Sequence, residues 1–327
     1  MRARHTVGLC LLLCAAATVL ATAQSAGRVV TLDLALASLV PESATIEKLV
    51  GGLGFAEGPV WVHGALLFSD IPGNAIHRLS SGQDSVFRTP IYERADFKPG
   101  FHIGSNGLTV DRQGRLIICE HGNRRVTRLE ANGQLTVLAD RYEGKRLNSP
   151  NDAVVKSDGS IYFTDPPYGL PAQDKDPGKE LTFSGVYRLA DGKLQLLTSE
   201  LTRPNGLGFS PDEKYLYVAN SDPARRVWMR YEVKPDGSLG TGTVFYDLAS
   251  VPERGIPDGL KLDAAGNLFG TGPAGVWVIS PAGKALGRIE PPEVPANVAW
   301  GEDGKTLYMT ARTSVYRIRL NAVGSLP

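Results

Sequence analysis

The sequence predicts an all-β protein, a six-bladed β-propeller whose ring is closed by an N-terminal strand. A unit made of a polar residue, an alternating strand, a turn and a second alternating strand recurs six times. The copies begin between residues 57 and 297, so the mean of the five spacings is 48 residues. Helical periodicity is scarce, and turn residues fall at strand-scale intervals. A period of about 40 to 50 residues with several short strands is typical of a propeller blade.

Each copy begins with a polar residue, called the head residue below. The copies are EGPVWVHGALLFSD, NGLTVDRQGRLIICE, NDAVVKSDGSIYFTD, NGLGFSPDEKYLYVAN, DGLKLDAAGNLFGTG and NVAWGEDGKTLYMTA. Their head residues are Glu57, Asn106, Asn151, Asn205, Asp258 and Asn297. Most copies continue into a third strand of the form V-x-R-[LIY], such as VTRL and VYRL. Because the first strand of each blade lines the central channel, we expect the head residues to face one another around the axis.

The last copy holds only about three strands before the chain ends. Residues 44–50, ATIEKLV, precede the first copy and could supply the missing outer strand, which would close the ring and remove its exposed edges. The longest insertion, residues 168–182, lies between strands of the third copy, and its Pro, Asp and Lys content predicts a surface loop at the channel mouth. We expect one domain over residues 24–327.

Residues 1–23 have the pattern of a secretory signal peptide. A basic start is followed by an apolar run of about 14 to 17 residues and an A-x-A cleavage site, and that run is short for a bilayer span of roughly 20 residues. We therefore expect export to the periplasm or medium, with no membrane attachment after cleavage. Cys10 and Cys14 would leave with this peptide, so Cys119 alone remains and an internal disulfide is excluded.

The charge balance gives no sign of a polyanionic partner. The formal net charge is +1, and removal of Arg2 and Arg4 with the signal peptide changes it to −1. Nucleic-acid-binding proteins and proteins of anionic membrane surfaces carry basic patches or runs. The sequence therefore predicts neither partner, and it makes no prediction about oligomeric state.

The head residues combine two carboxylates with four carboxamides. Two carboxylates in a narrow channel repel each other unless a cation or a proton separates them. Carboxylate and carboxamide oxygens suit Ca²⁺ or Mg²⁺, and no His or Cys pair has zinc spacing. An alternative is that the heads are polar because the channel mouth is wet or because Asn and Asp favour turns, but this explains Glu57 poorly. We predict one divalent cation on the axis.

The longest motifs match a known family. They are FAEGPVW, RLNSPNDAVVKSDGSIYFTDPPYG, RPNGLGFSPDEKYLYVANS and IPDGLKLDAAGNLF, and the match extends from about Phe55 to Arg312. The chain resembles the senescence-marker-protein, gluconolactonase and luciferin-regenerating-enzyme family, most closely its bacterial gluconolactonase branch. The resemblance implies a six-bladed propeller with one catalytic divalent cation, most often Ca²⁺, with Zn²⁺, Mn²⁺ or Mg²⁺ as alternatives.

The resemblance also implies residue roles. It assigns the cation to Glu57, Asn205 and Asp258, with Asn151 as a further ligand or a substrate contact. The implied reaction is hydrolysis of a carboxylic ester bond in a small-molecule sugar lactone, as in D-glucono-1,5-lactone to gluconate. In the mechanistic hypothesis that follows, the cation polarises the lactone carbonyl, and Asp258 is both a ligand and the general base for water.

Several further residues are candidates for contact with the substrate or for structural roles. Asn106 and His102 are expected near the substrate, and Arg312 is expected to bind substrate hydroxyls or the carboxylate product. His121 could face the channel or the surface. Arg124 and Arg125 are expected in a solvated turn, and Cys119 is expected to be a buried structural thiol rather than a nucleophile. A serine esterase is disfavoured because no serine lies in a G-x-S-x-G motif.

Two other functions stay open at this point. One is a paraoxonase-like esterase or lactonase that acts on other substrates, and the other is a non-catalytic propeller that binds metal or a partner. A pure scaffold would have no need of the Glu57 and Asp258 carboxylates on the axis, which favours an enzyme. The fold alone does not distinguish among these three functions.

Overall fold

A computed structural model describes residues 25–93 and 101–324 of the 327-residue chain. The expected signal peptide, residues 1–23, lies outside the described residues and stays a prediction. Helix in the described part is limited to two short 3₁₀ segments, η1 (Leu34–Ser38) and η2 (Gln173–Lys175). Neither of these, nor any other described segment, is a helix long and apolar enough to cross a bilayer.

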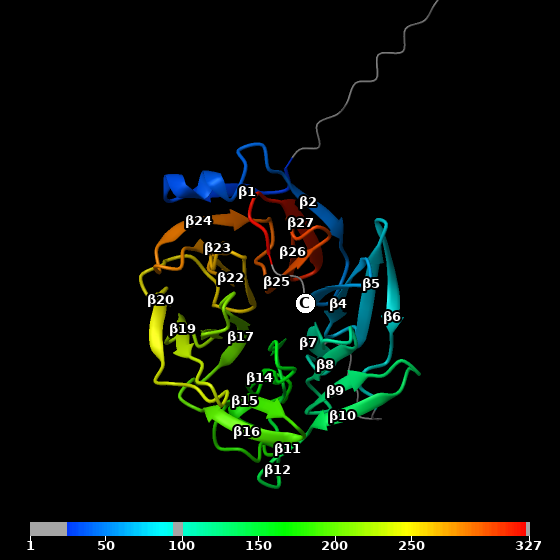
Figure 1. The fold of residues 1–327 in the computed structure, drawn as a ribbon. Helices are drawn as coiled ribbons and strands as arrows, with labels where there is room; N and C mark the ends of the chain where they lie inside the picture. The colour runs from blue at the N-terminus through cyan, green and yellow to red at the C-terminus, as the bar shows by residue number, and fades with distance from the viewer. Residues whose placement is uncertain (1–24, 94–100, 325–327) are drawn as a thin grey trace, which may run out of the picture.

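Six antiparallel sheets surround a central axis, which confirms the predicted propeller (Figure 1). Blade I contains β3 (Ala56–Val62), β4 (Ala65–Asp70), β5 (Ala75–Ser80) and β6 (Gln83–Arg88). Blade II contains β7 (Ser105–Val110), β8 (Leu116–Glu120), β9 (Arg125–Leu129) and β10 (Leu135–Ala139). Blade III contains β13 (Ala153–Val155), β14 (Ile161–Asp165), β15 (Gly185–Ala190) and β16 (Lys193–Thr198). A small hairpin, β11 (Arg141–Tyr142) and β12 (Lys145–Arg146), lies between blades II and III in the sequence.

The second half of the ring has the same plan. Blade IV contains β17 (Pro204–Phe209), β18 (Tyr215–Asn220), β19 (Val227–Glu232) and β20 (Thr243–Asp247). Blade V contains β21 (Leu260–Leu262), β22 (Leu268–Gly272), β23 (Gly275–Ile279) and β24 (Ala285–Glu290). Blade VI contains β25 (Asn297–Gly301), β26 (Thr306–Ala311) and β27 (Ser314–Arg319) from the C-terminal part of the chain. In each blade, successive strands are neighbours in space.

The ring closes as the sequence predicted. Strand β2 (Ile46–Val50) pairs antiparallel with β27, with Ile46 opposite Ile318 (Figure 1). The N-terminal segment thus becomes the outer strand of blade VI and covers an edge that would otherwise be exposed. This pairing ties the first blade to the last through the backbone.

A second N-terminal strand was not predicted. Strand β1 (Arg28–Thr31) adds a fifth strand to blade V by pairing with β24, and Arg28 Nε lies 2.7 Å from Glu290 Oε2. The segment is four residues long, too short to show a clear alternation. Its position therefore depends on the closure of blade VI, which brings the chain past blade V.

The hydrophobic core lies between neighbouring blades. One buried cluster joins Tyr217 and Trp228 of blade IV to Leu260 and Trp277 of blade V. Similar clusters join the other neighbouring blades. Close packing of large side chains between sheets makes the inner strands a rigid frame for whatever the channel holds.

Four of the six head residues are followed by glycine, and these glycines allow the inner strands to approach each other. A Cβ added to Gly58 would lie 2.0 Å from Asn106 O, and one added to Gly206 would lie 2.4 Å from Asp258 O. A Cβ added to Gly107 would lie 2.5 Å from Asn151 O, and one added to Gly259 would lie 2.0 Å from the side chain of Asn297. Any side chain at these four positions would collide with a neighbouring blade, so glycine fixes the spacing of the head residues.

Candidate active site

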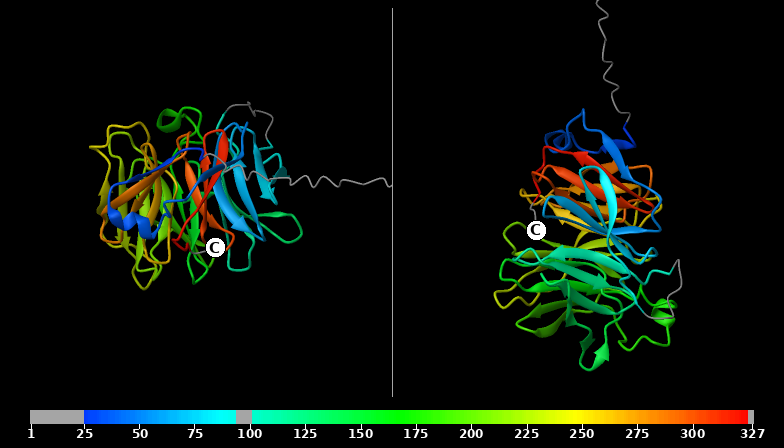
Figure 2. Two further views of the ribbon diagram at one scale, coloured as in Figure 1. Left: turned by 90° about the horizontal axis from the view of Figure 1, so that it is seen from above. Right: turned by 90° about the vertical axis from the view of Figure 1, so that its right-hand side faces the viewer.

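A cavity of about 400 Å³ opens on one face of the ring at the channel mouth. Pockets that hold small molecules commonly range from about 300 to 1,000 Å³. Its lining consists of Phe55, Glu57, Ile71, Phe101, His102, Ile103, Asn106, His121, Asn151, Tyr168, Gly169, Leu170, Pro171, Gln173, Asn205, Ile256 and Asp258. Figure 2 shows the segment around η2 standing above the disc on one face. Because Gln173 of η2 belongs to the lining, that face carries the cavity.

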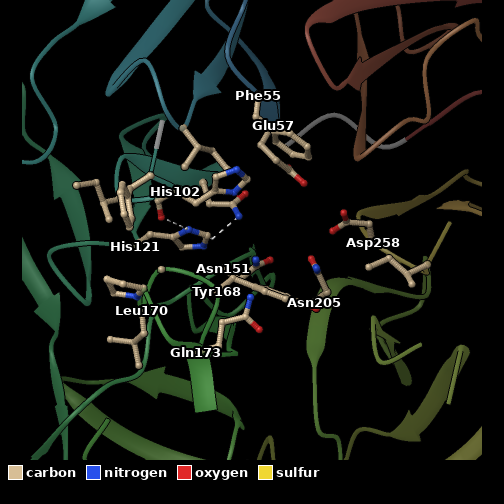
Figure 3. Close-up of a pocket in the computed structure, with 17 residues that line it drawn as sticks. Phe55, Glu57, His102, His121, Asn151, Tyr168, Leu170, Gln173, Asn205 and Asp258 are labelled. Atoms are coloured by element: carbon tan, nitrogen blue, oxygen red, sulfur yellow. Dashed lines mark hydrogen bonds between the residues drawn. The ribbon is translucent and has the colours of Figure 1, made fainter. Parts of the chain in front are cut away.

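The fold brings five of the six head residues into this cavity. Glu57, Asn106 and Asn205 lie on the first strands of their blades, whereas Asn151 and Asp258 shortly precede theirs. Figure 3 shows Glu57, Asn151, Asn205 and Asp258 pointing toward a common centre. The four residues predicted as ligands therefore lie together in space, although they come from blades I, III, IV and V, and their role as ligands stays a prediction.

The two carboxylates of the ring, Glu57 and Asp258, both have raised pKa values. Burial, together with the negative charge of Asp152, raises the pKa of Glu57 to about 7. Burial raises the pKa of Asp258 well above its usual value, the Glu57 and Asp152 carboxylates raise it further, and a hydrogen bond from the Asn205 carboxamide lowers it. Without a cation, the site therefore favours protonation of these groups. A divalent cation would supply the missing positive charge.

The carboxamide oxygens provide a second reason to expect a cation. Within the described residues, the buried atoms Asn205 Oδ1 and Asn106 Oδ1 have no hydrogen-bond partner. Buried polar atoms are nearly always paired, and these two oxygens belong to residues that line the cavity, so they are available to a ligand there. No group of three or more His, Cys, Asp or Glu side chains in the described part could hold an ion. The cavity offers carboxylate oxygens from Glu57 and Asp258 beside these carboxamide oxygens, and such a mixed set would fit a hard cation such as Ca²⁺.

His121 is a pocket residue that the sequence left undecided. Its side chain is buried, its Nε2 lies 3.0 Å from Asn106 Nδ2, and its Nδ1 lies 3.2 Å from the backbone oxygen of His102 (Figure 3). Burial and the nearby His102 lower the pKa of His121 to about 3, so the ring is neutral at about pH 7. The surface alternative for His121 is thus excluded. The sequence could not predict the direction of the His121 side chain, because the residue lies in a turn directly after a strand, where the strand alternation has ended.

His102 lies in the cavity, as expected for a substrate contact. Its ring packs against Phe55 with 5.1 Å between ring centroids, and burial lowers its pKa. The histidine is therefore held mainly neutral, and its ring nitrogens can donate and accept hydrogen bonds.

The insertion at residues 168–182 supplies one wall of the cavity. Tyr168, Leu170, Pro171 and Gln173 line it. Burial, and then the Asp258 carboxylate, raise the pKa of Tyr168, so its hydroxyl stays protonated and can donate a hydrogen bond. Sequence reasoning identified the loop but not the inward direction of Gln173, because the loop carries no periodic pattern.

This loop is anchored by two arginines. Arg203 forms an ion pair with Asp174, and its guanidinium lies 5.8 Å from the centre of the Tyr168 ring. Arg124 Nη1 donates a 2.7 Å hydrogen bond to Gly178 O. The expectation of a solvated turn for Arg124 and Arg125 is therefore wrong. Arg124 is buried against the loop, and Arg125 pairs with the buried Glu120 at 2.8 Å.

Arg312 lies apart from the other predicted residues. It is exposed in the turn between β26 and β27, and it is absent from the residues that line the cavity. Its backbone oxygen accepts a 2.6 Å hydrogen bond from Ala56 N, one residue before Glu57. The structure therefore connects Arg312 to the site through the backbone. Its role in binding substrate stays a prediction. Cys119 is buried and unpaired, as expected for a structural thiol.

Comparison with known proteins identifies the family of the chain. The family described as the SMP-30/Gluconolactonase/LRE-like region matches residues 55–313. The chain belongs to this family. A gluconolactonase of Zymomonas mobilis subsp. mobilis is 35% identical, and the alignment covers 95% of this chain and 93% of that protein. A 6-deoxy-6-sulfogluconolactonase of Pseudomonas putida is 31% identical over 78% of this chain and 82% of its own length.

Solved structures of the family share the fold. A gluconolactonase of Xanthomonas campestris superposes with a TM-score of 0.77 and is 34% identical, covering 91% of this chain and 99% of its own. The calcium-binding protein regucalcin of Agrobacterium tumefaciens superposes with a TM-score of 0.70 at 20% identity, over 86% of this chain and 95% of its own. The second likeness concerns the fold alone.

Proposed function

We propose that this protein is a lactonase that hydrolyses a gluconolactone-like sugar lactone to the aldonic acid with the help of one divalent cation. Family membership supports an enzyme that cleaves the carboxylic ester bond of a lactone, because relatives at 31 to 35% identity are named as lactonases. One observation carries the cation dependence. Glu57, Asn205 and Asp258 converge in one cavity, with two mutually repelling carboxylates and an unpaired carboxamide oxygen.

In this proposal Glu57, Asn205 and Asp258 hold the cation, and Asn151 is a fourth ligand or a substrate contact. The donor set favours Ca²⁺, with Zn²⁺, Mn²⁺ or Mg²⁺ as alternatives. When bound, a divalent cation supplies a Lewis acid that polarises the lactone carbonyl. Proton transfer and binding of the sugar hydroxyls are assigned to side chains of the protein.

Asp258 is proposed as the general base. Its carboxylate accepts a proton from the water that adds to the carbonyl carbon, the ring C–O bond then breaks, and the proton passes to the departing ring oxygen. A carboxylate that also holds a cation is a weaker base than a free one. Asp258→Asn therefore tests both roles at once, and full turnover with full cation affinity in that variant would exclude both.

The other lining residues suit a hydroxyl-rich ligand. His102, Tyr168 and Gln173 each present a polar group to the cavity, and Asn106 is oriented by its hydrogen bond to His121. Phe55 and Ile256 provide apolar surface beside them. We propose that these polar groups bind the sugar hydroxyls, with the signal peptide at residues 1–23 directing the enzyme to the periplasm or medium.

The test is a proton-release assay on the chain from residue 24 onward, using glucono-1,5-lactone. Activity should vanish with EDTA and return when Ca²⁺, Mn²⁺ or Zn²⁺ is added, and the order of the three ions would identify the preferred one. Aryl esters and phosphotriesters serve as alternative substrates for the paraoxonase-like function. Hydrolysis of glucono-1,5-lactone no faster than the spontaneous rate, with cation shown to bind by calorimetry, would exclude the gluconolactonase. Absence of hydrolysis of other lactones, aryl esters and phosphotriesters as well would leave the binding propeller.

A further inference from the structure

One additional carboxylate, that of Asp152, lies next to the head residues at the axis. At four of the six positions after a head, glycine leaves the channel free of side chains. The two exceptions are Asp152 and Val298. Val298 packs into the core of blades V and VI, but Asp152 Oδ1 would lie only 2.7 Å from a Cβ added to Gly107 of the neighbouring inner strand. Asp152 therefore places a carboxylate where four other inner strands have glycine and the remaining one has the core residue Val298.

Asn297, the sixth head residue, links this carboxylate to the cavity. Its Nδ2 donates to Glu57 Oε2 at 3.0 Å and to Asp152 Oδ2 at 3.3 Å. Its Oδ1 accepts a 2.8 Å hydrogen bond from Val298 N. The orientation of the carboxamide is thereby fixed, because the reversed amide would turn its oxygen toward two carboxylates.

This arrangement also explains why Asn297 is not itself a cavity residue. Its carboxamide group packs against Gly259, where an added Cβ would lie 2.0 Å from Asn297 Cγ. Glu57 Oε2 accepts hydrogen bonds from Asn297 Nδ2 and from Gly58 N at 2.5 Å. Both donors hold the same oxygen of Glu57. The other oxygen, Oε1, is left to face the cavity.

The charges of the axis balance when Asp152 is included. Glu57 and Asp152 are 3% and 2% exposed, and the Asp258 carboxylate lies beside them. Lys261, which lines a second cavity, carries an ammonium that favours the ionised form of Asp152 against the effect of burial. Three carboxylates, one divalent cation and one ammonium sum to zero. A buried cluster of this kind is stable only when its charges are compensated.

We propose that Asp152 and Asn297 are positioning residues for the axial cation. Asn297 holds Glu57 in the orientation that presents Oε1 to the cavity, and Asp152 adds the third negative charge that strengthens cation binding. Neither residue touches the substrate. This inference rests on the proposed cation-dependent function, and it concerns how tightly the cation is held.

The isosteric variant Asp152→Asn separates this role from a merely structural one. It removes a negative charge from the axis but keeps an oxygen that can accept from Asn297. The cation-free variant should unfold at the same temperature as the wild type or higher, because repulsion with Glu57 is gone. Its Ca²⁺ affinity should fall at least tenfold, in the range of about 10 to 100-fold seen when outer partners of metal ligands are changed. A structural residue would lower stability and affinity together.

Asn297→Ala tests the orientation of Glu57, and Asn267→Ala is its matched control. Asn267 is also a buried asparagine, and its Nδ2 donates to a carboxylate, Asp263 Oδ2, at 2.7 Å, but it lies in the β21–β22 turn. Asn297→Ala should weaken Ca²⁺ binding at least tenfold. Asn267→Ala should lower the unfolding temperature without changing Ca²⁺ affinity.

The measurements are Ca²⁺ titration calorimetry and thermal unfolding in EDTA for the wild type and the three variants. Wild-type affinity in both Asp152→Asn and Asn297→Ala, with the wild type binding one Ca²⁺, would overturn this inference and leave the proposed function intact. Absence of binding of Ca²⁺, Mn²⁺ and Zn²⁺ to the wild type would overturn both. Weakened binding in the two axial variants but not in Asn267→Ala is the expected result.

Discussion

Asn106 Nδ2 and His121 Nε2 lie 3.0 Å apart at the wall of the cavity. Because the amide nitrogen can only donate, His121 Nε2 accepts, and the proton of the neutral ring lies on Nδ1, which faces the backbone oxygen of His102 at 3.2 Å. This single tautomer satisfies both contacts. It also turns Asn106 Oδ1, which has no partner in the described part of the chain, away from His121 and leaves it free for a ligand.

The first prediction concerns this pair. His121→Phe keeps the ring volume but removes the acceptor, so Asn106 Nδ2 loses its partner and its carboxamide can rotate. A buried unpaired donor costs about 1 to 3 kcal/mol, so we expect kcat/KM for glucono-1,5-lactone to fall about 5- to 150-fold. His77→Phe is the control, because His77 lies in blade I and pairs with Asp84. Equal kinetics for both variants and the wild type would contradict the prediction.

The same pair predicts part of the pH profile. The pKa of His121 is about 3, so this residue does not change charge between about pH 5 and about pH 8. Removal of the imidazole should therefore lower the rate at every pH in that range without moving the inflections of the profile. The check is kcat/KM against pH for the wild type and His121→Phe, corrected for spontaneous hydrolysis. Loss of an inflection near neutral pH in the variant would mean that His121 titrates there.

The second residue-level prediction concerns the two carboxylates of the cavity. Glu57→Gln and Asp258→Asn each remove one of the charges that hold the cation, so we expect the Ca²⁺ dissociation constant to rise about 100-fold or more in both. A difference should appear in turnover at saturating Ca²⁺. Glu57→Gln should recover part of its activity, whereas Asp258→Asn should not, because it also lacks the base. Asp263→Asn, which changes a buried carboxylate in a turn of blade V, is the control.

The cation-free protein should lose stability as the pH rises. The pKa of Glu57 is about 7 in the folded chain, against 4.5 for an ordinary glutamate, and that of Asp258 is also raised. Between these values the folded state keeps a proton that the unfolded state has released, so the free energy of unfolding falls as the pH rises through this window. Thermal unfolding in EDTA between about pH 5 and about pH 8 should show this decline.

Two additions sharpen that experiment. Glu57→Gln should show a smaller decline with pH, because one of the two titrating groups is absent. Ca²⁺ should raise the unfolding temperature of the wild type more at the alkaline end than at the acid end, since protons and cation compete for the same oxygens. A cation-free wild type whose stability rises steadily over this range would show that burial does not raise the pKa values of Glu57 and Asp258 in the folded chain.

A further prediction concerns the loop at residues 168–182. Arg203→Met removes the ion pair with Asp174 and the contact with the Tyr168 ring, which loosens one wall of the cavity. Exposed ion pairs are worth about 0 to 1 kcal/mol, so KM should rise up to about fivefold while kcat changes little. Limited proteolysis should cut the loop faster in this variant. Lys214→Met, which breaks an exposed pair with Asp212, should change neither KM nor the cleavage rate.

The repeated pattern predicted most of the fold because it is a local property. Strand alternation and turn residues recur in every copy, and the same sequence pattern places a polar head residue at the start of each inner strand. The closing strand β2 was predictable for a related reason, since a blade of three strands leaves an edge that another segment must cover. The short β1 had no comparable signal. Its partner β24 lies near the opposite end of the chain.

The sequence by itself determined the blade number, the closing strand and the set of polar heads from which the cavity oxygens come. Only the tertiary structure decided which head residues face the cavity. It determined that Asn297 donates a hydrogen bond to Glu57, which is 240 residues away in the sequence. It also decided that His121 is buried and that Arg124 reaches Gly178. The physical reason is that a periodic pattern encodes the direction of a side chain relative to its own strand. The partner of that side chain depends on how closely the blades pack, and in this protein that distance is fixed by glycines on the inner strands.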